Sequence, residues 1–252
     1  MKTKELISIN PKNNLKIKSW NILSQKEVET FVKDTSDAQI IWKTINLNSR
    51  LSLIKKLSST LKDNIKNFSV LMADEIGKPF VQGEAEINKC IWLCNYYIDN
   101  AEAYLSPEQI ETEFYKSYTS FQPLGIVFGI MPWNFPFWQV FRYAVPALIV
   151  GNGVLLKHAS NVQGCANAIE KCFKDAGFPE NIFKNLQITS DMGSRLIENN
   201  KIAGVALTGS TLAGKAVAKK AGEFLKKTVL ELGGNDPYII LDDANIDKAV
   251  EA

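Results

Sequence analysis

The feature that most constrains the fold of this chain is an alternation of short apolar runs with helical segments, which begins at Gly125. The runs are rich in β-branched residues, and amphipathic segments separate most of them. Alternation at this spacing predicts an α/β fold, a parallel sheet with helices on both faces. We expect its strands at residues 125–130, 153–157, 185–188, 204–209, 228–232 and 237–241.

The residues before Gly125 have a different pattern. Residues 111–123 alternate aromatic and polar side chains, which predicts an exposed two-stranded ribbon. We therefore divide the chain into an N-terminal helical part (1–110), the ribbon (111–123) and the sheet region (124–252). Long amphipathic stretches predict N-terminal helices at residues 24–39, 49–73 and 83–104.

Composition excludes several classes of function. The chain has 252 residues, 46% of them apolar and 22% charged, and a formal net charge of +2, so no basic surface for nucleic acid is expected. The first residues carry positive charge but no apolar run of signal-peptide length. Four cysteines without CxxC spacing and a single histidine argue against a metal site. We expect a cytoplasmic protein with reduced cysteines.

One apolar stretch, Gly125 to Leu156, is long enough to raise the question of a membrane span. Arg142 is its only formally charged residue. A single helix through it would be broken by Pro132 and Pro136. We therefore predict a strand, an irregular turn and a buried helix, with no membrane segment.

Residues 207–216, LTGSTLAGKA, resemble a phosphate-binding loop. Gly209, Gly214 and Lys215 reproduce the GxxxxGK pattern, but Ala216 stands where a Ser or Thr hydroxyl would coordinate Mg²⁺. A P-loop nucleoside triphosphatase is therefore a minor alternative. A strand that runs into a Gly-rich turn and a helix start also suits the pyrophosphate of a dinucleotide. A tight structural turn is the third reading.

Two polar residues lie in the apolar stretch MPWNFPFWQVFR, residues 131–142. Asn134 stands between two prolines at a strand end, where its amide N–H would either stabilise an oxyanion or hold the loop. Arg142 lies among aromatic residues and needs an anionic partner. That partner is either an internal acid or the carboxylate of a substrate.

Two charged residues follow apolar runs at predicted strand ends. Lys157 ends GVLLK, where its ammonium would bind ribose hydroxyls or a phosphate, or would simply reach solvent. Glu231 precedes Leu-Gly-Gly, and glycines there let other groups approach a carboxylate closely. Glu231 is therefore either a general base or an ordinary ion-paired acid.

Four segments in this order resemble the successive signature segments of the aldehyde dehydrogenase superfamily. They are MPWNFP (131–136), LLKHAS (155–160), LTGSTLAG (207–214) and LELGGNDP (230–237). The resemblance extends from about residue 8 to the last residue. It implies a Rossmann-like NAD(P)-binding region, oxidation of an aldehyde to a carboxylic acid, and homo-oligomers in which the ribbon joins an oligomerisation sheet.

The resemblance also implies a role for each residue that matches a signature segment. Asn134 would hold the oxyanion of the thiohemiacetal, and Glu231 would activate the water that hydrolyses the thioester. Lys157 would bind the adenosine ribose. The remaining residues expected at the cofactor are Met131, Pro132, Trp133, Ser160, Gly209, Ser210, Gly214 and Leu232.

Two departures from the family pattern matter. The segment of Lys157 often ends in Glu, which repels a 2′-phosphate, and here the position is Ser160, so the cofactor is NAD or NADP. The family's nucleophilic cysteine follows the ELGG segment, and none of the four cysteines lies there. We therefore expect the N-terminal half of an aldehyde dehydrogenase, without the catalytic cysteine domain and inactive alone.

Within the family, the wording KHASNVQGCA, DAGFPENIF and LELGGNDPYIIL most resembles enzymes that oxidise succinate semialdehyde. In those enzymes an Arg eight residues beyond the PWN asparagine binds the free carboxylate of the substrate. Arg142 occupies this position. The alternative expectation is a remnant that binds NAD(P) or a partner without catalysis.

Overall fold

The computed structural model describes residues 5–251, and its centre is a five-stranded sheet in the order β7-β6-β5-β8-β9. All four strand pairs are parallel, which confirms the predicted α/β fold. Parallel neighbours need crossover connections, and helices supply them here. The strands are β5 (Ile126–Met131), β6 (Gly153–His158), β7 (Phe183–Asn185), β8 (Ile202–Gly209) and β9 (Lys227–Leu232).

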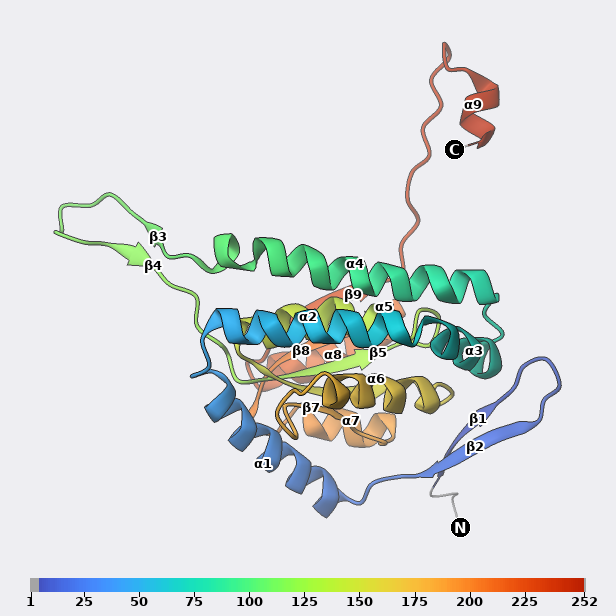
Figure 1. Ribbon diagram of the computed structural model, residues 1–252, viewed down its shortest axis with the longest axis horizontal. Coiled ribbons are helices and arrows are strands. Elements are labelled where there is room, and N and C mark those ends of the chain that lie inside the picture. The colour runs from blue at the N-terminus through green and yellow to red at the C-terminus, as the bar shows by residue number, and fades with distance from the viewer. Residues whose placement is uncertain (1–4, 252) are drawn as a thin grey trace.

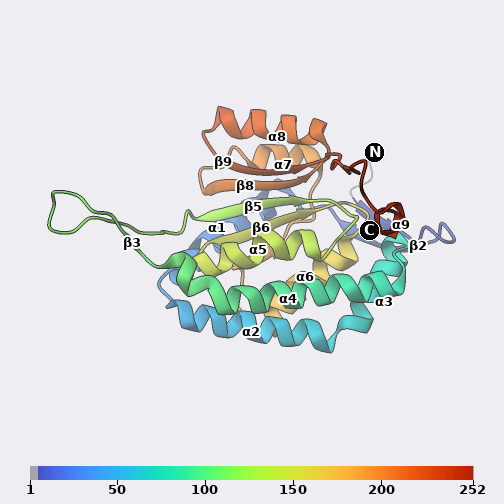
Figure 2. The same cartoon turned by 90° about the horizontal axis from the view of Figure 1, so that it is seen from above.

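Helices cover both faces of this sheet, as Figure 2 shows for α7 and α8 on one side and α5 on the other. Phe128 and Leu155 are fully buried against the first set of helices, whereas Val154 and Leu156 are buried against the second set. Alternate strand residues therefore fill two separate cores. The first set is α1 (Gln25–Trp42), α7 (Ser190–Leu196) and α8 (Thr211–Glu223), and the second is α5 (Trp138–Val150) and α6 (Gln163–Asp175).

Helix α5 approaches β5 closely because Gly129 has no side chain. A Cβ at Gly129 would lie 2.1 Å from Cζ of Tyr143, so the Tyr143 ring occupies the space that any other residue would fill. Tyr143 is half-buried overall, and the burial of its ring against the sheet raises the pKa of the phenol. The contact fixes the helix that carries Arg142 over the sheet.

Three helices form an outer layer beyond α5 and α6. The predicted single helix at 49–73 is wrong, because the chain leaves helical geometry at Asn64 (φ −116°, ψ 9°), whose side chain donates to the carbonyl of Thr60 at 2.9 Å. An Asn that bonds its local backbone in this way favours a helix end. The predicted helix at 83–104 is confirmed. The three helices are α2 (Leu47–Asp63), α3 (Ile65–Ile76) and α4 (Phe80–Leu105).

Two antiparallel hairpins project from the body (Figure 1). The N-terminal hairpin was not predicted from the sequence. The predicted ribbon at 111–123 forms, but it pairs over only two residues on each side, and its first strand lies wholly before residue 111. The strands are β1 (Glu5–Ile9), β2 (Lys16–Asn21), β3 (Glu108–Gln109) and β4 (Tyr118–Thr119).

The prediction of a strand at 237–241 is wrong. This segment is exposed and pairs with no described strand, and the chain beyond β9 extends away from the body to α9 (Ile246–Glu251) (Figure 1). An apolar run becomes a strand only where a neighbour can satisfy its backbone groups. The strand predicted at 185–188 lies earlier in the chain than expected, since β7 spans Phe183–Asn185.

The apolar stretch from Gly125 to Leu156 folds as the sequence predicts, into β5, a turn, the buried helix α5 and the start of β6. Helix α5 ends at Gly151, whose φ of 105° suits a residue without a side chain. Within residues 5–251, no helix combines the length and the apolar character that crossing a membrane requires.

Candidate functional site

The strand order reverses between β5 and β8, and the site is built around this point. The chain proceeds outward from β5 through β6 to β7, then returns to place β8 on the other side of β5. In such sheets ligands bind beyond the carboxyl ends of the strands at this switch point. The turn with Asn134 follows β5, and Gly209 ends β8 with Ser210 directly after it, so the fold brings these predicted residues to one edge.

The predicted residues at the end of β5 and in the turn after it differ in how exposed they are. Met131 is buried, Pro132 is half-buried, and Trp133 and Asn134 are exposed. Asn134 is therefore not enclosed by the protein in this structure. Its side-chain oxygen accepts a hydrogen bond from the Phe135 amide at 3.1 Å, which is a local turn contact. The Asn134 amide N–H group faces no described acceptor and is available to a ligand.

A buried carboxylate from α4 holds this turn. Oε1 of Glu86 accepts hydrogen bonds from the backbone amides of Phe137 at 2.8 Å and Trp138 at 2.9 Å, and thereby caps α5, which has no local side-chain cap. The other carboxylate oxygen pairs with Lys78, and both side chains are nearly inaccessible. The Lys78 ammonium lies 3.8 Å from the centre of the Phe135 ring.

Glu86 and Lys78 were not among the residues predicted from the sequence. Glu86 nevertheless gives a signal, because it is an acid on the buried side of α4, next to Ile87 and one turn before Cys90. An ionised acid on an apolar stripe must find partners inside the protein. That reasoning would have identified Glu86 as an anchoring residue without naming the amides that it binds.

His158, at the end of β6, holds the same turn from the other side. Its Nδ1 accepts from the Ala159 amide at 2.9 Å, so Nε2 carries the proton and donates to the carbonyl of Pro136 at 2.9 Å. Burial lowers the pKa of His158 to about 4, so the imidazole is neutral near pH 7. A neutral ring in one tautomer fits a positioning role.

The turn after β8 begins α8 with a capping residue. Oγ of Ser210 accepts from the Ala213 amide at 3.3 Å, and Gly209 is the last residue of the strand. The first turn of a helix leaves several N–H groups without an intrahelical acceptor, and the helix dipole adds positive potential there. This helix start is therefore suited to a phosphate group.

Gly214 serves the packing of α8 on β9. A Cβ at Gly214 would lie 2.5 Å from Cδ2 of Leu232, so the glycine lets strand and helix approach. These two residues, both predicted at the cofactor, therefore contact each other. Residues 211–214 are already helical, so they form no loop that could wrap a triphosphate, and Lys215 is exposed. The geometry disfavours the P-loop alternative.

Lys157 lies at the same edge of the sheet, near the end of β6. Its Cδ atom lies 3.0 Å from the Cβ position of Gly193 in α7, so the stem runs along that helix. Burial lowers the pKa of the Lys157 ammonium, and among the described residues no carboxylate pairs with it. Ser160 lies just beyond it and is exposed.

Arg142 and Glu231 form an ion pair across the other face of the sheet. Nη2 of Arg142, on α5, lies 2.8 Å from Oε1 of Glu231, on β9. Their side chains are 35% and 52% exposed. Of the two partners that the sequence left open for Arg142, the structure contains the internal acid, and this acid is the other predicted catalytic residue.

The pair lines a cavity of about 310 Å³ between α5 and the β8–β9 half of the sheet. Met131 contributes to its wall. Neutral side chains make up the rest of the lining. The outer part of this face is open, because Val229 of β9 is 64% exposed. The cavity therefore joins a predicted cofactor residue to the two charged residues of the predicted substrate site.

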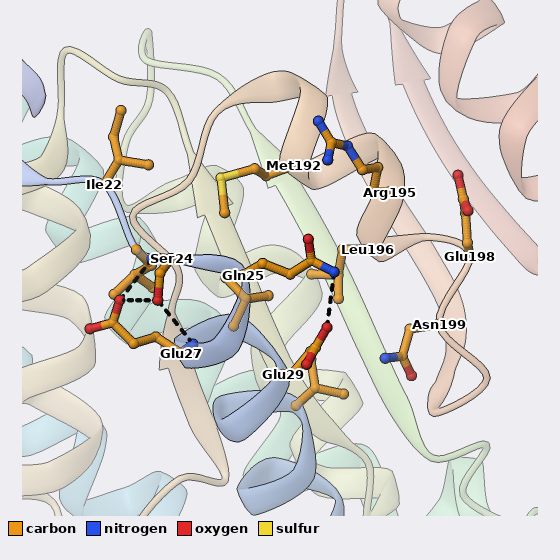
Figure 3. A pocket seen from close by; sticks show the side chains of 13 residues that line it. Ile22, Ser24, Gln25, Glu27, Glu29, Met192, Arg195, Leu196, Glu198 and Asn199 are labelled. Carbon is orange, nitrogen blue, oxygen red and sulfur yellow. Dashed lines mark hydrogen bonds between the residues drawn. The ribbon is translucent and has the colours of Figure 1, made fainter. Parts of the chain in front are cut away.

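A larger cavity of about 880 Å³ lies between α1 and α7, away from all the predicted residues (Figure 3). Its carboxylates already have partners. Glu27 binds Ser24 in the capping box of α1, and Glu29 accepts from Gln25 at 3.0 Å. Among the described residues, no group of three or more His, Cys, Asp or Glu side chains is arranged to hold a metal ion.

The predicted residues thus divide between the two faces at one edge of the sheet. Lys157, Ser210 and Leu232 lie on the face of α7 and α8. Arg142 and Glu231 lie on the face of α5. The turn of Asn134 stands between the two groups, because it follows β5 at the point where the strand order reverses.

Comparisons with known proteins show which proteins this chain is similar to. A probable NADP(+) succinate-semialdehyde dehydrogenase of Synechocystis sp. is 42% identical over 246 residues, which are 98% of this chain and 54% of that protein. The NAD(P)+ succinate semialdehyde dehydrogenase Sad of Escherichia coli is 39% identical over 246 residues, 98% of this chain and 53% of that protein.

A solved structure has the same fold. It is the succinic semialdehyde dehydrogenase of Streptococcus pyogenes in complex with NADP+, with a TM-score of 0.93 and 30% identity, covering 99% of this chain and 55% of that chain. The chain thus spans about half the length of the curated relatives it matches. Residues 1–252 match the family described as "Aldehyde dehydrogenase family", and this chain belongs to that family.

Proposed function

We propose that this chain forms the NAD(P)-binding part and one wall of the substrate site of an enzyme that oxidises an aldehyde to a carboxylic acid. The observation that carries the proposal is that Lys157, the α8 N-terminus and the Asn134 turn stand at the carboxyl ends of three neighbouring strands, at the switch point of the sheet. A cation, free amide groups and a side-chain amide are the donors that a dinucleotide and a developing oxyanion need.

The residues present fit NAD or NADP. The start of α8 offers N–H groups to a pyrophosphate, and the Lys157 ammonium is free of carboxylate partners among the described residues. Ser160 carries no charge that would repel a 2′-phosphate. The bound nicotinamide would accept a hydride from the substrate. The relatives from Synechocystis and Escherichia coli are described as NADP(+) and NAD(P)+ enzymes.

Succinate semialdehyde is the substrate we favour. Arg142 supplies the cation for its free carboxylate, and the cavity beside Arg142 is otherwise lined by neutral side chains and Glu231. Both curated relatives described above are named for this substrate. In this proposal Asn134 donates to the oxygen of the reacting carbonyl, and Glu231 accepts a proton from the water that releases the acid.

We infer that the nucleophile of this reaction is not one of the four cysteines of this chain. Cys90, Cys94, Cys165 and Cys172 are all buried. Burial raises the pKa of Cys94 and Cys172 to about 12 and raises the pKa of the other two thiols as well. A nucleophile must be an accessible thiolate. The chain by itself is therefore expected to bind the cofactor without turning over an aldehyde.

The binding half of the proposal is tested by titrating the chain with NADP+ in a calorimeter. Lys157→Met should weaken saturable binding about tenfold or more, because it removes a charge-assisted hydrogen bond. Lys215→Met is the matched control, since Lys215 is exposed on α8. Binding that Lys215→Met reduces and Lys157→Met leaves unchanged would contradict the assignment and favour the P-loop reading.

The catalytic half is tested by NADPH formation from succinate semialdehyde. The chain alone should give no more product than an Asn134→Ala variant. Turnover above that background would contradict the inference about the cysteines. A chain that binds NADP+ without turnover agrees with both the enzyme fragment and a non-catalytic binding module. Adding the remaining part of a relative as a separate chain separates the two, because only the fragment regains activity.

A further inference from the structure

The Arg142–Glu231 pair presents a conflict within the proposed site. In the proposed function Arg142 binds the substrate carboxylate, whereas in the structure its Nη2 is bound to Oε1 of Glu231 at 2.8 Å. A carboxylate gains most from a guanidinium when it takes two parallel N–H donors. Glu231 occupies Nη2, one of the two terminal nitrogens that a substrate carboxylate would use.

The cavity offers a second carboxylate no other cation. Apart from the pair itself, its lining consists of uncharged side chains such as Gln139, Tyr143 and Thr208. An anion that enters must therefore bind Arg142, and it must do so beside the negative charge of Glu231. Two carboxylates on one guanidinium repel each other, and a substrate carboxylate that takes both terminal nitrogens has to displace Glu231 from Nη2.

Glu231 is the carboxylate that is free to leave. Its side chain is 52% exposed, so it can rotate away from Arg142 into solvent. It belongs to β9, which is at the edge of the sheet. Gly233 and Gly234 follow it, and a Cβ at either would meet nothing within 4 Å. Arg142, in contrast, is held on α5 next to Tyr143, which packs into the space left by Gly129.

We propose that Glu231 is an internal ligand of Arg142 which the carboxylate of the substrate displaces, so that substrate binding releases the base. This inference rests on the proposed function. While Glu231 is paired, an N–H group of Arg142 occupies its Oε1, so this oxygen cannot accept a hydrogen bond from a water in the same direction. Once the substrate carboxylate takes Arg142, the oxygen of Glu231 becomes available to water. The same exchange favours aldehydes that carry an acid.

The probe for this exchange is succinamate, which has one carboxylate and a neutral amide in place of the aldehyde. Its affinity for the chain is measured by calorimetry in wild type, Glu231→Ala and Arg142→Met. Glu231→Ala should tighten binding about two- to fivefold, because an exposed ion pair contributes little and its loss frees Arg142. Arg142→Met should abolish binding. Succinamide, which is neutral, should bind none of the variants.

A matched variant separates competition from simple repulsion. Glu231→Asp keeps the negative charge on β9, but its side chain is one methylene shorter and cannot reach Arg142 from the same backbone position. If Glu231 is a displaced ligand, Glu231→Asp should also tighten succinamate binding. If Glu231→Asp binds like wild type while Glu231→Ala binds more tightly, the effect is only the local field, and the exchange is overturned.

The failure of the exchange can be told apart from the failure of the proposed function. Succinamate binding that depends on Arg142 but is equal in wild type and Glu231→Ala overturns the exchange and leaves Arg142 as the carboxylate site. Succinamate binding that survives Arg142→Met at full strength overturns the assignment of Arg142, and the exchange with it.

Discussion

The turn after β5 and the segment after β9 make an instructive comparison, because each lies next to a residue of the proposed reaction. Asn134 stands in a turn that buried groups hold from two sides, namely Glu86 of α4 and His158 of β6. Glu231 stands on an edge strand whose continuation is exposed and pairs with no described strand. The chain therefore fixes the turn of the proposed oxyanion donor by itself, while it leaves the proposed base free to move.

The difference follows from how each segment satisfies its polar groups. In the β5 turn, buried amides and a carbonyl find partners inside the protein, and leaving such groups unpaired would be costly. Beyond β9 the backbone is exposed, and water can satisfy it. Changes to the anchors of the first segment should therefore have large effects, and changes around the second should have small ones.

The largest effect should come from Glu86→Gln, which leaves the Lys78 ammonium buried without a counter-charge. We expect the free energy of unfolding to fall by about 3–5 kcal/mol. Denaturation in urea measures the loss. Glu102→Gln, an exposed position on the same helix, is the control and should change stability by no more than about 0.5 kcal/mol. Equal effects of the two substitutions would show that Glu86 does not anchor the turn.

The second effect is a dependence of stability on pH that arises from His158, the only histidine of the chain. Burial lowers the pKa of His158 in the folded state to about 4, from 6.5, so the unfolded chain binds a proton more readily. Stability is full above about pH 6.5, and it should fall by about 1.4 kcal/mol for each pH unit below that, down to about pH 4.

The pH effect is measured by urea denaturation between pH 7 and pH 5, above the range where most carboxylates titrate. His158→Gln, which cannot titrate, should make the stability of the chain nearly independent of pH in this interval. A wild-type chain that is equally stable at pH 7 and pH 5 would contradict the buried neutral imidazole.

A smaller effect is expected where α8 meets β9. Gly214→Ala places a Cβ against Leu232, and the strand or the side chain must shift, which should lower stability by roughly 1–3 kcal/mol. Gly222→Ala on the same helix meets nothing within 4 Å, so it should instead stabilise the chain by up to about 1 kcal/mol. If both substitutions stabilise the chain, β9 is not held against α8 as the structure has it.

The smallest effect should come from Glu231→Gln. The pair with Arg142 is partly exposed, so its loss should change the free energy of unfolding by less than about 1 kcal/mol. Thermal and urea denaturation together measure a change of this size. A loss as large as that of Glu86→Gln would mean that Glu231 is a structural anchor, and it would remove the contrast between the two segments.

The sequence predicts the parts of the fold that depend on local pattern. Apolar runs and their spacing predict the parallel sheet and four of its five strands closely. The same pattern predicts a strand at 237–241 that does not form, because a run of apolar residues does not reveal whether a neighbouring strand exists. The helix break at Asn64 was missed for a related reason, since the apolar periodicity continues through it.

The site is predictable to the extent that its residues stand at strand ends. Lys157, Ser210 and the turn of Asn134 each stand at the carboxyl end of a strand, where the apolar runs of the sequence end. The contact of Arg142 with Glu231 joins residues that are far apart in the chain, so only the packing of α5 over the sheet brings them together. The roles of Glu86 and His158 depend on which backbone groups are buried next to them, and the sequence does not show this.

The most direct test of the contrast between the two segments is native-state hydrogen exchange. We predict that the amides of Phe137 and Trp138, which donate to Glu86, exchange only through global unfolding. The amides of Gly233 and Gly234 should exchange at rates close to those of an unstructured peptide. Comparable protection of the two pairs of amides would contradict the claim that the chain fixes the Asn134 turn and leaves the Glu231 segment free.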